Sequence, residues 1–97
     1  EDPYASSQTW NCEGATIIAE KGSSSRQVET YLPRQHRSFN GTSALTDAPI
    51  TTQAPELYRV ADDNGITLAH PQDNTISFLH IYGPKERDFA DRVQADA

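Results

Sequence analysis

Three apolar segments separated by short turn sequences constrain the fold of this chain more than any other feature. The first segment covers residues 57–61, the second residues 66–70 and the third residues 75–82. The turn sequence at residues 62–65, DDNG, is typical of a tight reversal of the chain. Apolar segments joined by such short turns pair as neighbouring antiparallel strands. The C-terminal half of the sequence therefore predicts an antiparallel sheet.

Weaker strand signals lie nearer the N-terminus. Residues 9–19 predict one strand, or two short strands broken at Gly14. Residues 37–40 and 44–51 predict two further strands, the second interrupted at Pro49. Together with the C-terminal segments, these regions make the chain rich in strand.

One short helix is expected among these strands. Ser24 and Gln27 have the spacing of a capping box, which marks the start of a helix. Apolar residues then recur at helical spacing from Val28 to Leu32. We expect Pro33 to end this helix, because proline removes a backbone donor and clashes with the preceding turn.

The order of these elements predicts an α+β fold with one short helix packed on an antiparallel sheet. A chain of 97 residues has room for a single domain. We expect a flexible N-terminus over residues 1–8, the domain over residues 9–83, and an acidic helix or tail over residues 84–97. In this last segment Phe89 and Val93 are four residues apart and could share one helix face.

Composition and charge exclude several classes of protein. The net charge of −6 argues against tight, nonspecific binding to nucleic acid, which needs many lysine and arginine contacts to phosphate. No apolar run approaches the ~20 residues that a membrane span requires. The single cysteine cannot form an internal disulfide or a cysteine zinc site, and the three histidines are scattered. We therefore expect no metal, no cofactor and no membrane insertion.

Several residues of chemically versatile types have simple structural explanations. Trp10 and Tyr31 are expected in the core rather than as base-stacking platforms. His36 and His80 are expected to have structural roles. Cys12 is interpreted as a small buried residue or as an exposed free thiol.

A series of short motifs follows one another in a recognisable order. They are Trp10-Asn11-Cys12-Glu13-Gly14, Phe39-Asn40-Gly41, Asp47-Ala48-Pro49-Ile50, Tyr58-Arg59-Val60 and Ile66-Thr67-Leu68-Ala69-His70. This order resembles the RNase-like effectors of powdery mildews, a family related to the small fungal guanyl-specific ribonucleases. The resemblance covers roughly residues 9–82 and implies a microbial ribonuclease-like fold.

The resemblance also implies roles for individual residues. Ribonuclease cleavage needs a general base, a general acid and a cationic group that stabilises the charged phosphorane. By resemblance Asp47 stands where the base lies, Arg59 where the phosphate-binding arginine lies, and His70 where the acid lies. Arg34 occupies the place of a second catalytic histidine, and His36 follows two residues later.

This set departs from the pattern of the active enzymes. Asp47 is one methylene shorter than the usual glutamate, and a displacement of about 1 Å can cost roughly 100-fold in rate. The second cysteine that usually pairs with the first is absent, and residues 84–97 have no counterpart in the ribonucleases. We therefore expect no catalytic residues and treat Asp47, Arg59, His70 and His36 as vestigial.

The resemblance then predicts a secreted fungal effector that is delivered into host plant cells. It is expected to be a noncatalytic monomer that binds host plant proteins. Its RNA binding is expected to be weak or absent. The resemblance further implies recognition by an intracellular leucine-rich-repeat immune receptor. The residues expected to contact a partner are the exposed loop residues Arg34, Gln35, Arg37, Asp62, Asp63 and Asn64.

Two alternatives stay open at the level of sequence. One is an active or RNA-binding, guanyl-preferring endoribonuclease that uses Asp47, Arg59 and His70, with help from His36. The other is an unrelated small secreted β-rich binding protein or inhibitor.

Overall fold

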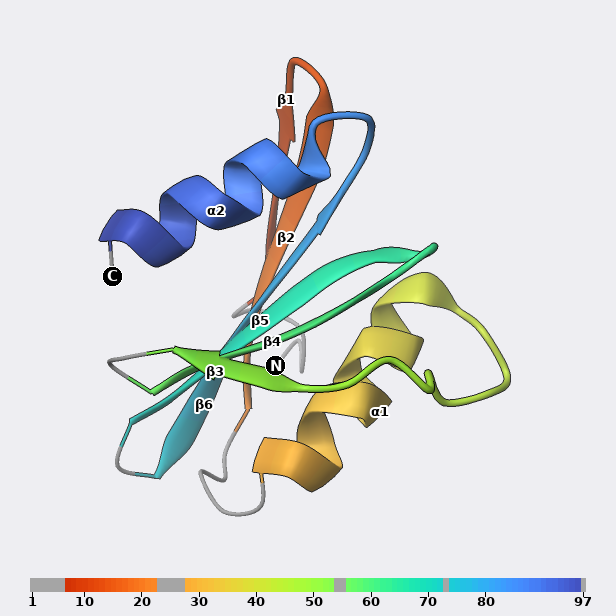
Figure 1. The fold of residues 1–97 in the computed structure, drawn as a ribbon, viewed down its shortest axis with the longest axis vertical. Helices are drawn as coiled ribbons and strands as arrows, with labels where there is room; N and C mark the ends of the chain where they lie inside the picture. The colour runs from red at the N-terminus through yellow and green to blue at the C-terminus, as the bar shows by residue number, and fades with distance from the viewer. Residues whose placement is uncertain (1–6, 23–27, 54–55, 73, 97) are drawn as a thin grey trace.

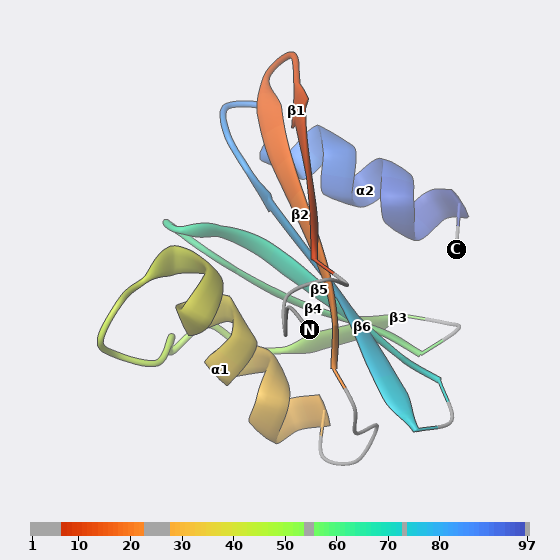
Figure 2. The same cartoon turned by 180° about the vertical axis from the view of Figure 1, so that it is seen from behind.

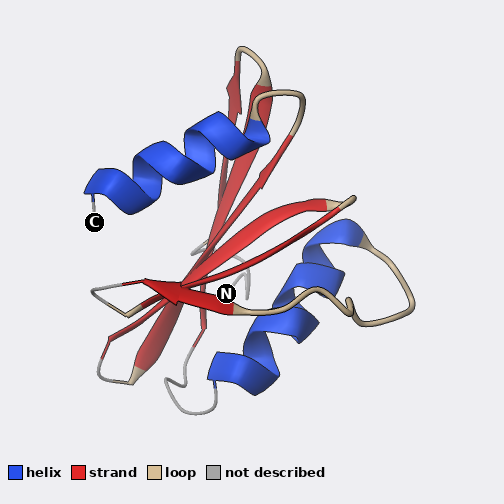
Figure 3. Ribbon diagram, in the orientation of Figure 1, coloured by secondary structure: helices blue, strands red, loops and turns tan. Residues whose placement is uncertain are grey.

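The computed structural model describes residues 7–22, 28–53, 56–72 and 74–96 and contains one six-stranded sheet with two helices (Figure 1; Figure 3). The strands are β1 Gln8–Cys12, β2 Ala15–Gly22, β3 Thr51–Gln53, β4 Leu57–Asp62, β5 Gly65–Gln72 and β6 Thr75–Tyr82, and the helices are α1 Val28–Asn40 and α2 Glu86–Asp96. The α+β class predicted from the sequence is confirmed. The proposed capping box at Ser24 and Gln27 lies outside the described residues.

Strand order in the sheet is β1-β2-β6-β5-β4-β3, and the neighbours pair antiparallel. The predicted C-terminal meander is therefore present, with β4, β5 and β6 side by side. Strand β6, the most apolar segment of the chain, lies near the middle of the sheet, between β2 and β5. Its two faces alternate, so Phe78 and His80 face α1 while Leu79 and Ile81 face α2.

Each helix covers one face of the sheet, and the two helices lie on opposite sides of it (Figures 1 and 2). The core on the α1 side consists of Val28, Leu32, Val60, Ala69, Ile76 and Phe78. The core on the α2 side consists of Ala15, Leu57, Ile66, Leu68, Ile81 and Ala90. A sheet buried on both faces accounts for the apolar residues on both faces of β5 and β6.

Helix α1 is longer than predicted, because it runs through Pro33 to Asn40. The expectation that Pro33 ends the helix is wrong, and residues 37–40 are helical rather than a strand. The physical reason is burial, since Leu32 and His36 stand four residues apart on one face and are 0% and 2% exposed. Packing of this face offsets the one intrahelical hydrogen bond that proline removes.

The segment between α1 and β3 also differs from prediction. Residues 44–50 form no strand, and only the last residue of the predicted segment, Thr51, belongs to β3. The Thr46 hydroxyl accepts a hydrogen bond from the Ala48 amide at 3.1 Å, which is a local turn. Ala48 and Ile50 nevertheless pack against the α1-side core.

Two expected core residues lie at the surface. Trp10 is 46% exposed and Tyr31 is 40% exposed, so their predicted burial is wrong. Trp10 lies on the edge strand β1, and Tyr31 points away from the face of α1 that Leu32 and His36 bury. The acidic C-terminal segment forms helix α2, and Phe89 and Val93 pack together against the α2-side core.

Candidate functional site

The residues predicted for ribonuclease chemistry are divided between the two faces of the sheet. Arg59 on β4 pairs with Leu68 on β5, so its side chain and that of His70 lie on the α2 face. His36 instead projects from α1 onto the opposite face, where it contacts Thr67. Asp47 is exposed in the loop before β3. The sheet therefore separates His36 from Arg59 and His70.

Helix α2 occupies the guanidinium of Arg59. Its Nη1 donates a hydrogen bond to Asp91 Oδ1 at 2.8 Å and another to Gln94 Oε1. The Arg59 side chain is 16% exposed and that of Asp91 is 61% exposed, so the ion pair lies at the margin of solvent. Arg59 thus fastens the C-terminal half of α2 to the sheet.

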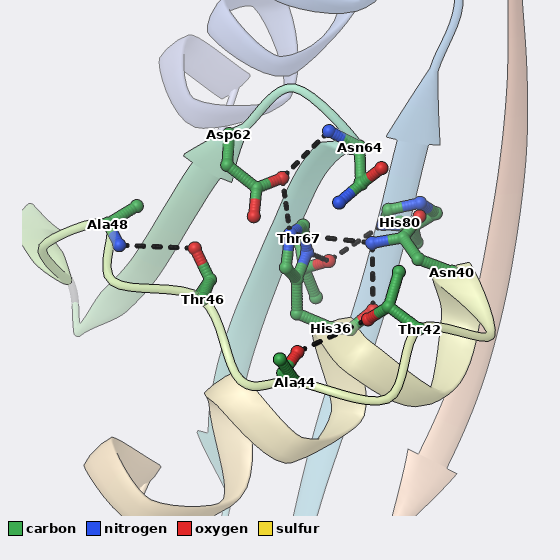
Figure 4. Close-up of polar contacts among 10 residues, drawn as sticks. All are labelled: His36, Asn40, Thr42, Ala44, Thr46, Ala48, Asp62, Asn64, Thr67 and His80. Carbon is green, nitrogen blue, oxygen red and sulfur yellow. Dashed lines mark hydrogen bonds and ion pairs between the residues drawn. The ribbon is translucent and has the colours of Figure 1, made fainter.

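On the α1 face, four polar side chains form a continuous hydrogen-bond chain, which we call the His-Thr-His chain (Figure 4). His36 Nε2 lies 2.8 Å from Asp62 Oδ1, and His36 Nδ1 lies 2.6 Å from Thr67 Oγ1. The same Thr67 oxygen lies 2.7 Å from His80 Nδ1. His36, Thr67 and His80 are 2%, 0% and 0% exposed. This is the most buried polar cluster among the described residues.

Local sequence accounts for the position of each member. His36 lies one turn after Leu32 on the buried face of α1. Thr67 and His80 are direct cross-strand partners on β5 and β6. Asp62 ends β4, and the Asn64 amide donates to its Oδ1 at 2.8 Å, an Asx turn that reverses the chain.

The carboxylate determines how hydrogens are arranged along the chain. Asp62 accepts a hydrogen bond from His36 Nε2. When the His36 ring is neutral, its Nδ1 therefore carries no hydrogen and accepts a hydrogen bond from the Thr67 hydroxyl. The Thr67 oxygen can then accept from His80 Nδ1. This leaves His80 Nε2 as a bare acceptor, and among the described residues it has no hydrogen-bond partner.

Electrostatics agree with that arrangement. Burial pushes the pKa of Asp62 upward, but hydrogen bonds from Thr46, His36 and the Asn64 amide outweigh burial and hold that pKa below its usual value. Burial, and the positive charge of His36 when that ring is protonated, lower the pKa of His80 to about 4 against the opposing effect of Asp62 and the Asn64 backbone. At neutral pH Asp62 is therefore ionised and His80 is neutral.

Neighbouring residues cover the ring of His80, at one end of the His-Thr-His chain. The Phe39 ring stacks on His80 with centroids 5.1 Å apart and planes 9° from parallel. A Cβ atom at Gly65 would lie 2.9 Å from His80 Cε1. Both imidazoles are buried, and their hydrogen bonds tie α1 to β4, β5 and β6.

The residues predicted to contact a partner have different environments. Arg34, Gln35 and Arg37 are on helix α1 and not in a loop, which corrects the sequence-based expectation. Gln35 Nε2 donates to Glu20 Oε1 at 3.2 Å, and Arg37 is half-buried. Arg34 is exposed.

The turn between β4 and β5 is also only partly free. Asp63 and Asn64 are exposed at its tip. The prediction that Asp62 is a freely exposed loop residue is wrong. Its carboxylate pairs with His36, and its side chain is 22% exposed.

Sequence reasoning missed Thr67 and His80 as members of one cluster, as well as the role of Asp91 and Gln94. A polar residue on the inward face of an otherwise apolar strand is the signal that points to the first two. Thr67 lies between Ile66 and Leu68 in this way. No comparable local signal marks Asp91, because acidic residues are common on exposed helix faces.

Metal-binding clusters and membrane-spanning helices are both absent from the part of the chain that the structure describes. There, no group of three histidine, cysteine, aspartate or glutamate side chains could hold a metal ion. Also within the described residues, no helix combines the length and the apolarity needed to cross a membrane. Cys12 is exposed and has a free thiol.

The fold and the site define a small α+β protein with helices on both faces of one antiparallel sheet. No protein-family model, curated protein or solved structure matches the chain.

Proposed function

We propose that this chain is a noncatalytic protein-binding module on a ribonuclease-like scaffold, and that it acts as a secreted effector on host plant proteins. The observation that carries the proposal is the engagement of Arg59 by Asp91 and Gln94. A phosphate-binding arginine needs its guanidinium free for the phosphate oxygens. Here one of its terminal nitrogens, Nη1, already donates to a carboxylate and an amide oxygen of the protein.

The charge on α2 supports the same conclusion. The helix begins with Glu86 and Asp88, and Asp91 follows on the next turn. These carboxylates belong to the helix that covers the face with Arg59 and His70. With Asp96, the helix has four carboxylates against two arginines, Arg87 and Arg92, and this net negative charge of −2 disfavours a polyanion such as RNA. The separation of His36 from Arg59 by the sheet is a second obstacle to catalysis.

The edge strand β1 is the surface that best fits a protein partner. All five of its residues, QTWNC, are exposed, and none is charged or proline. Among the described residues no strand pairs with its outer side. An uncharged, unpaired edge strand can pair with an extended segment of a partner protein. The exposed Trp10 supplies an aromatic anchor for that partner.

The hairpin geometry identifies which backbone groups face outward from this edge. Cys12 pairs with Ala15 across a two-residue turn, so these two residues form a hydrogen-bonded pair. Outward-facing amide and carbonyl groups then belong to the alternate residues, Thr9 and Asn11. We assign to them the recognition of an extended segment of a host protein. Arg34, Asp63 and Asn64 are exposed and stay candidates for further contacts, including those to an immune receptor.

A guanyl-preferring endoribonuclease is the second candidate function. One observation favours it, namely that Arg59 and His70 share one face of adjacent strands. A cleavage assay on guanosine-containing oligonucleotides separates the two functions, with a 2′,3′-cyclic phosphate as the product to detect. We expect no cleavage by the wild-type chain. Cleavage that is lost in both Arg59→Ala and His70→Ala would overturn the proposal and establish a ribonuclease.

The binding function itself is tested at the β1 edge. Thr9→Pro removes an outward-facing amide and should leave the pairing of β1 with β2 intact. Thr9→Val is the matched control, because it changes the side chain and keeps the amide. In affinity capture from plant extract with quantitative mass spectrometry, partners of the wild type should be retained by Thr9→Val and depleted by Thr9→Pro. Equal capture by all three folded proteins would exclude strand addition at this edge.

A further inference from the structure

Helix α2 covers only part of its face of the sheet, and the uncovered part forms a pocket of about 310 Å³. This volume lies at the lower end of the roughly 300–1,000 Å³ that small-molecule sites occupy. Its apolar lining comes from β2, β4, β5, β6 and α2 through Ala19, Leu57, Leu68, Leu79 and Val93. The pocket is therefore a concave apolar site of ligand size.

A row of three polar residues borders the apolar lining. Lys21 on β2 pairs directly with Ser77 on β6, and Ser77 pairs directly with His70 on β5. All three side chains lie on the α2 face and line the pocket. An ammonium, a hydroxyl and an imidazole in one row are hydrogen-bond donors for an anionic group.

The positive charge of Lys21 is available for such a group. Glu20 is the only acidic residue among those that line the pocket, but it pairs with Phe78 on the opposite face and accepts a hydrogen bond from Gln35. Among the described residues, no carboxylate lies within ion-pair distance of Lys21. The nearby cation Arg59 is already paired with Asp91.

We propose that this pocket binds a small amphiphilic carboxylate. Its aliphatic or aromatic body lies against Leu57, Leu68 and Leu79, and its carboxylate lies along the row formed by Lys21, Ser77 and His70. The pocket lies on the side of the sheet that α2 covers, whereas the proposed protein-binding edge is β1. The proposal is therefore independent of the proposed function. Failure of one would leave the other standing.

Decanoate is a suitable probe, and 1-decanol is its uncharged counterpart. We expect titration of the ¹⁵N-labelled chain with decanoate, below its micelle concentration, to give saturable shifts at the amides of Ala19, Lys21, Ser77 and Leu79. Binding of decanol should be about 2- to 5-fold weaker, since one exposed ion pair contributes up to roughly 1 kcal/mol and 1.4 kcal/mol is tenfold. Shifts that do not saturate, or that centre on other residues, would overturn the proposal.

Two pairs of variants test the site, one pair for its charged half and one pair for its apolar half. Lys21→Gln should weaken decanoate binding by about 2- to 5-fold and leave decanol binding unchanged, whereas the change Lys85→Gln at the other lysine should affect neither. Ala19→Phe fills the pocket and should abolish binding of both probes. Thr9→Phe places the same side chain on the opposite face of the neighbouring strand and should preserve binding. Unchanged decanoate affinity in Lys21→Gln, or in a folded Ala19→Phe, would refute the assignment.

Discussion

His36 and His80 share a single hydroxyl, because the Nδ1 atoms of both rings lie within 2.7 Å of Thr67 Oγ1. The two rings also meet edge to face, with centroids 5.5 Å apart. His36 comes from α1 and His80 from the central strand β6, so the Thr67 hydroxyl on β5 joins the helix layer to the sheet. Because an unpaired polar group is costly in the low dielectric of the interior, Thr67 stabilises the fold by giving both Nδ1 atoms a partner.

Removal of the shared hydroxyl should therefore be costly. Thr67→Val has nearly the same shape but leaves both Nδ1 atoms without a partner. Each unpaired buried polar group costs about 1–3 kcal/mol, so for the two Nδ1 atoms we expect the free energy of unfolding to fall by about 2–6 kcal/mol. Urea denaturation measures this change. The exposed control Thr9→Val should stay within about 0.5 kcal/mol of the wild type, and a Thr67→Val value in the same range would show that the bridge does not stabilise the fold.

Stability should decline in mild acid because of His80. Its pKa is about 4 in the folded chain, compared with 6.5 for an unperturbed histidine. Between these pH values the unfolded chain binds the extra proton and the folded chain does not, so stability is complete above pH 6.5 and falls as the pH drops toward 4. The slope is at most about 1.4 kcal/mol per pH unit, with a total on the order of 3 kcal/mol. The lowered pKa of Asp62 adds a further loss in more acidic solution.

Chemical denaturation across this pH range measures the effect, with His80→Asn as the comparison. The asparagine amide can donate to Thr67 in place of the imidazole and does not gain a proton. Its stability should depend less on pH than that of the wild type. Two parallel pH profiles would mean that His80 titrates normally in the folded chain.

Gly65 should be intolerant of even the smallest side chain. Its φ of +115° disfavours other residues, and an added Cβ would lie 2.9 Å from both His80 Cε1 and the Ile81 carbonyl oxygen. We expect Gly65→Ala to lower the midpoint of urea unfolding by the equivalent of about 3 kcal/mol or more. Gly41 also has a positive φ, of +67°, but its Cβ would meet nothing within 4 Å. Gly41→Ala should therefore cost only about 1 kcal/mol, and equal losses would mean that backbone strain alone is responsible.

Pro33 should be a site where a substitution stabilises the protein. Alanine restores a backbone donor within α1 and removes the clash of the proline ring with the preceding turn. The greater freedom of the unfolded chain opposes this gain by up to about 1 kcal/mol, so we expect a net stabilisation of about 1–2 kcal/mol in Pro33→Ala. Thermal unfolding followed by circular dichroism provides the measurement. Arg34→Ala, at the exposed neighbouring position, should change stability by less than about 0.5 kcal/mol; a destabilised Pro33→Ala would mean that the proline ring is needed for packing.

Local patterns in the sequence determined the meander of β4, β5 and β6. The turn at residues 62–65 and the apolar strands around it are short-range signals, and short-range geometry is enough to pair them. The same kind of signal placed Phe89 and Val93 on one helix face. The α+β class follows from these signals, and it was predicted correctly.

Contacts between distant residues decided the rest. The burial of His36 against Thr67, 31 residues away, extends α1 beyond a proline that local rules treat as a stop. The pairing of Arg59 with Asp91, 32 residues later, places α2 over the face that carries Arg59 and His70. Free energies of packing and of buried hydrogen bonds depend on which residues meet in space, and this is not encoded in spacing or propensity along the chain. The sequence by itself therefore determined the meander of β4, β5 and β6 and the class of fold, whereas the tertiary structure decided which side chains form a site and which are held in place by a helix.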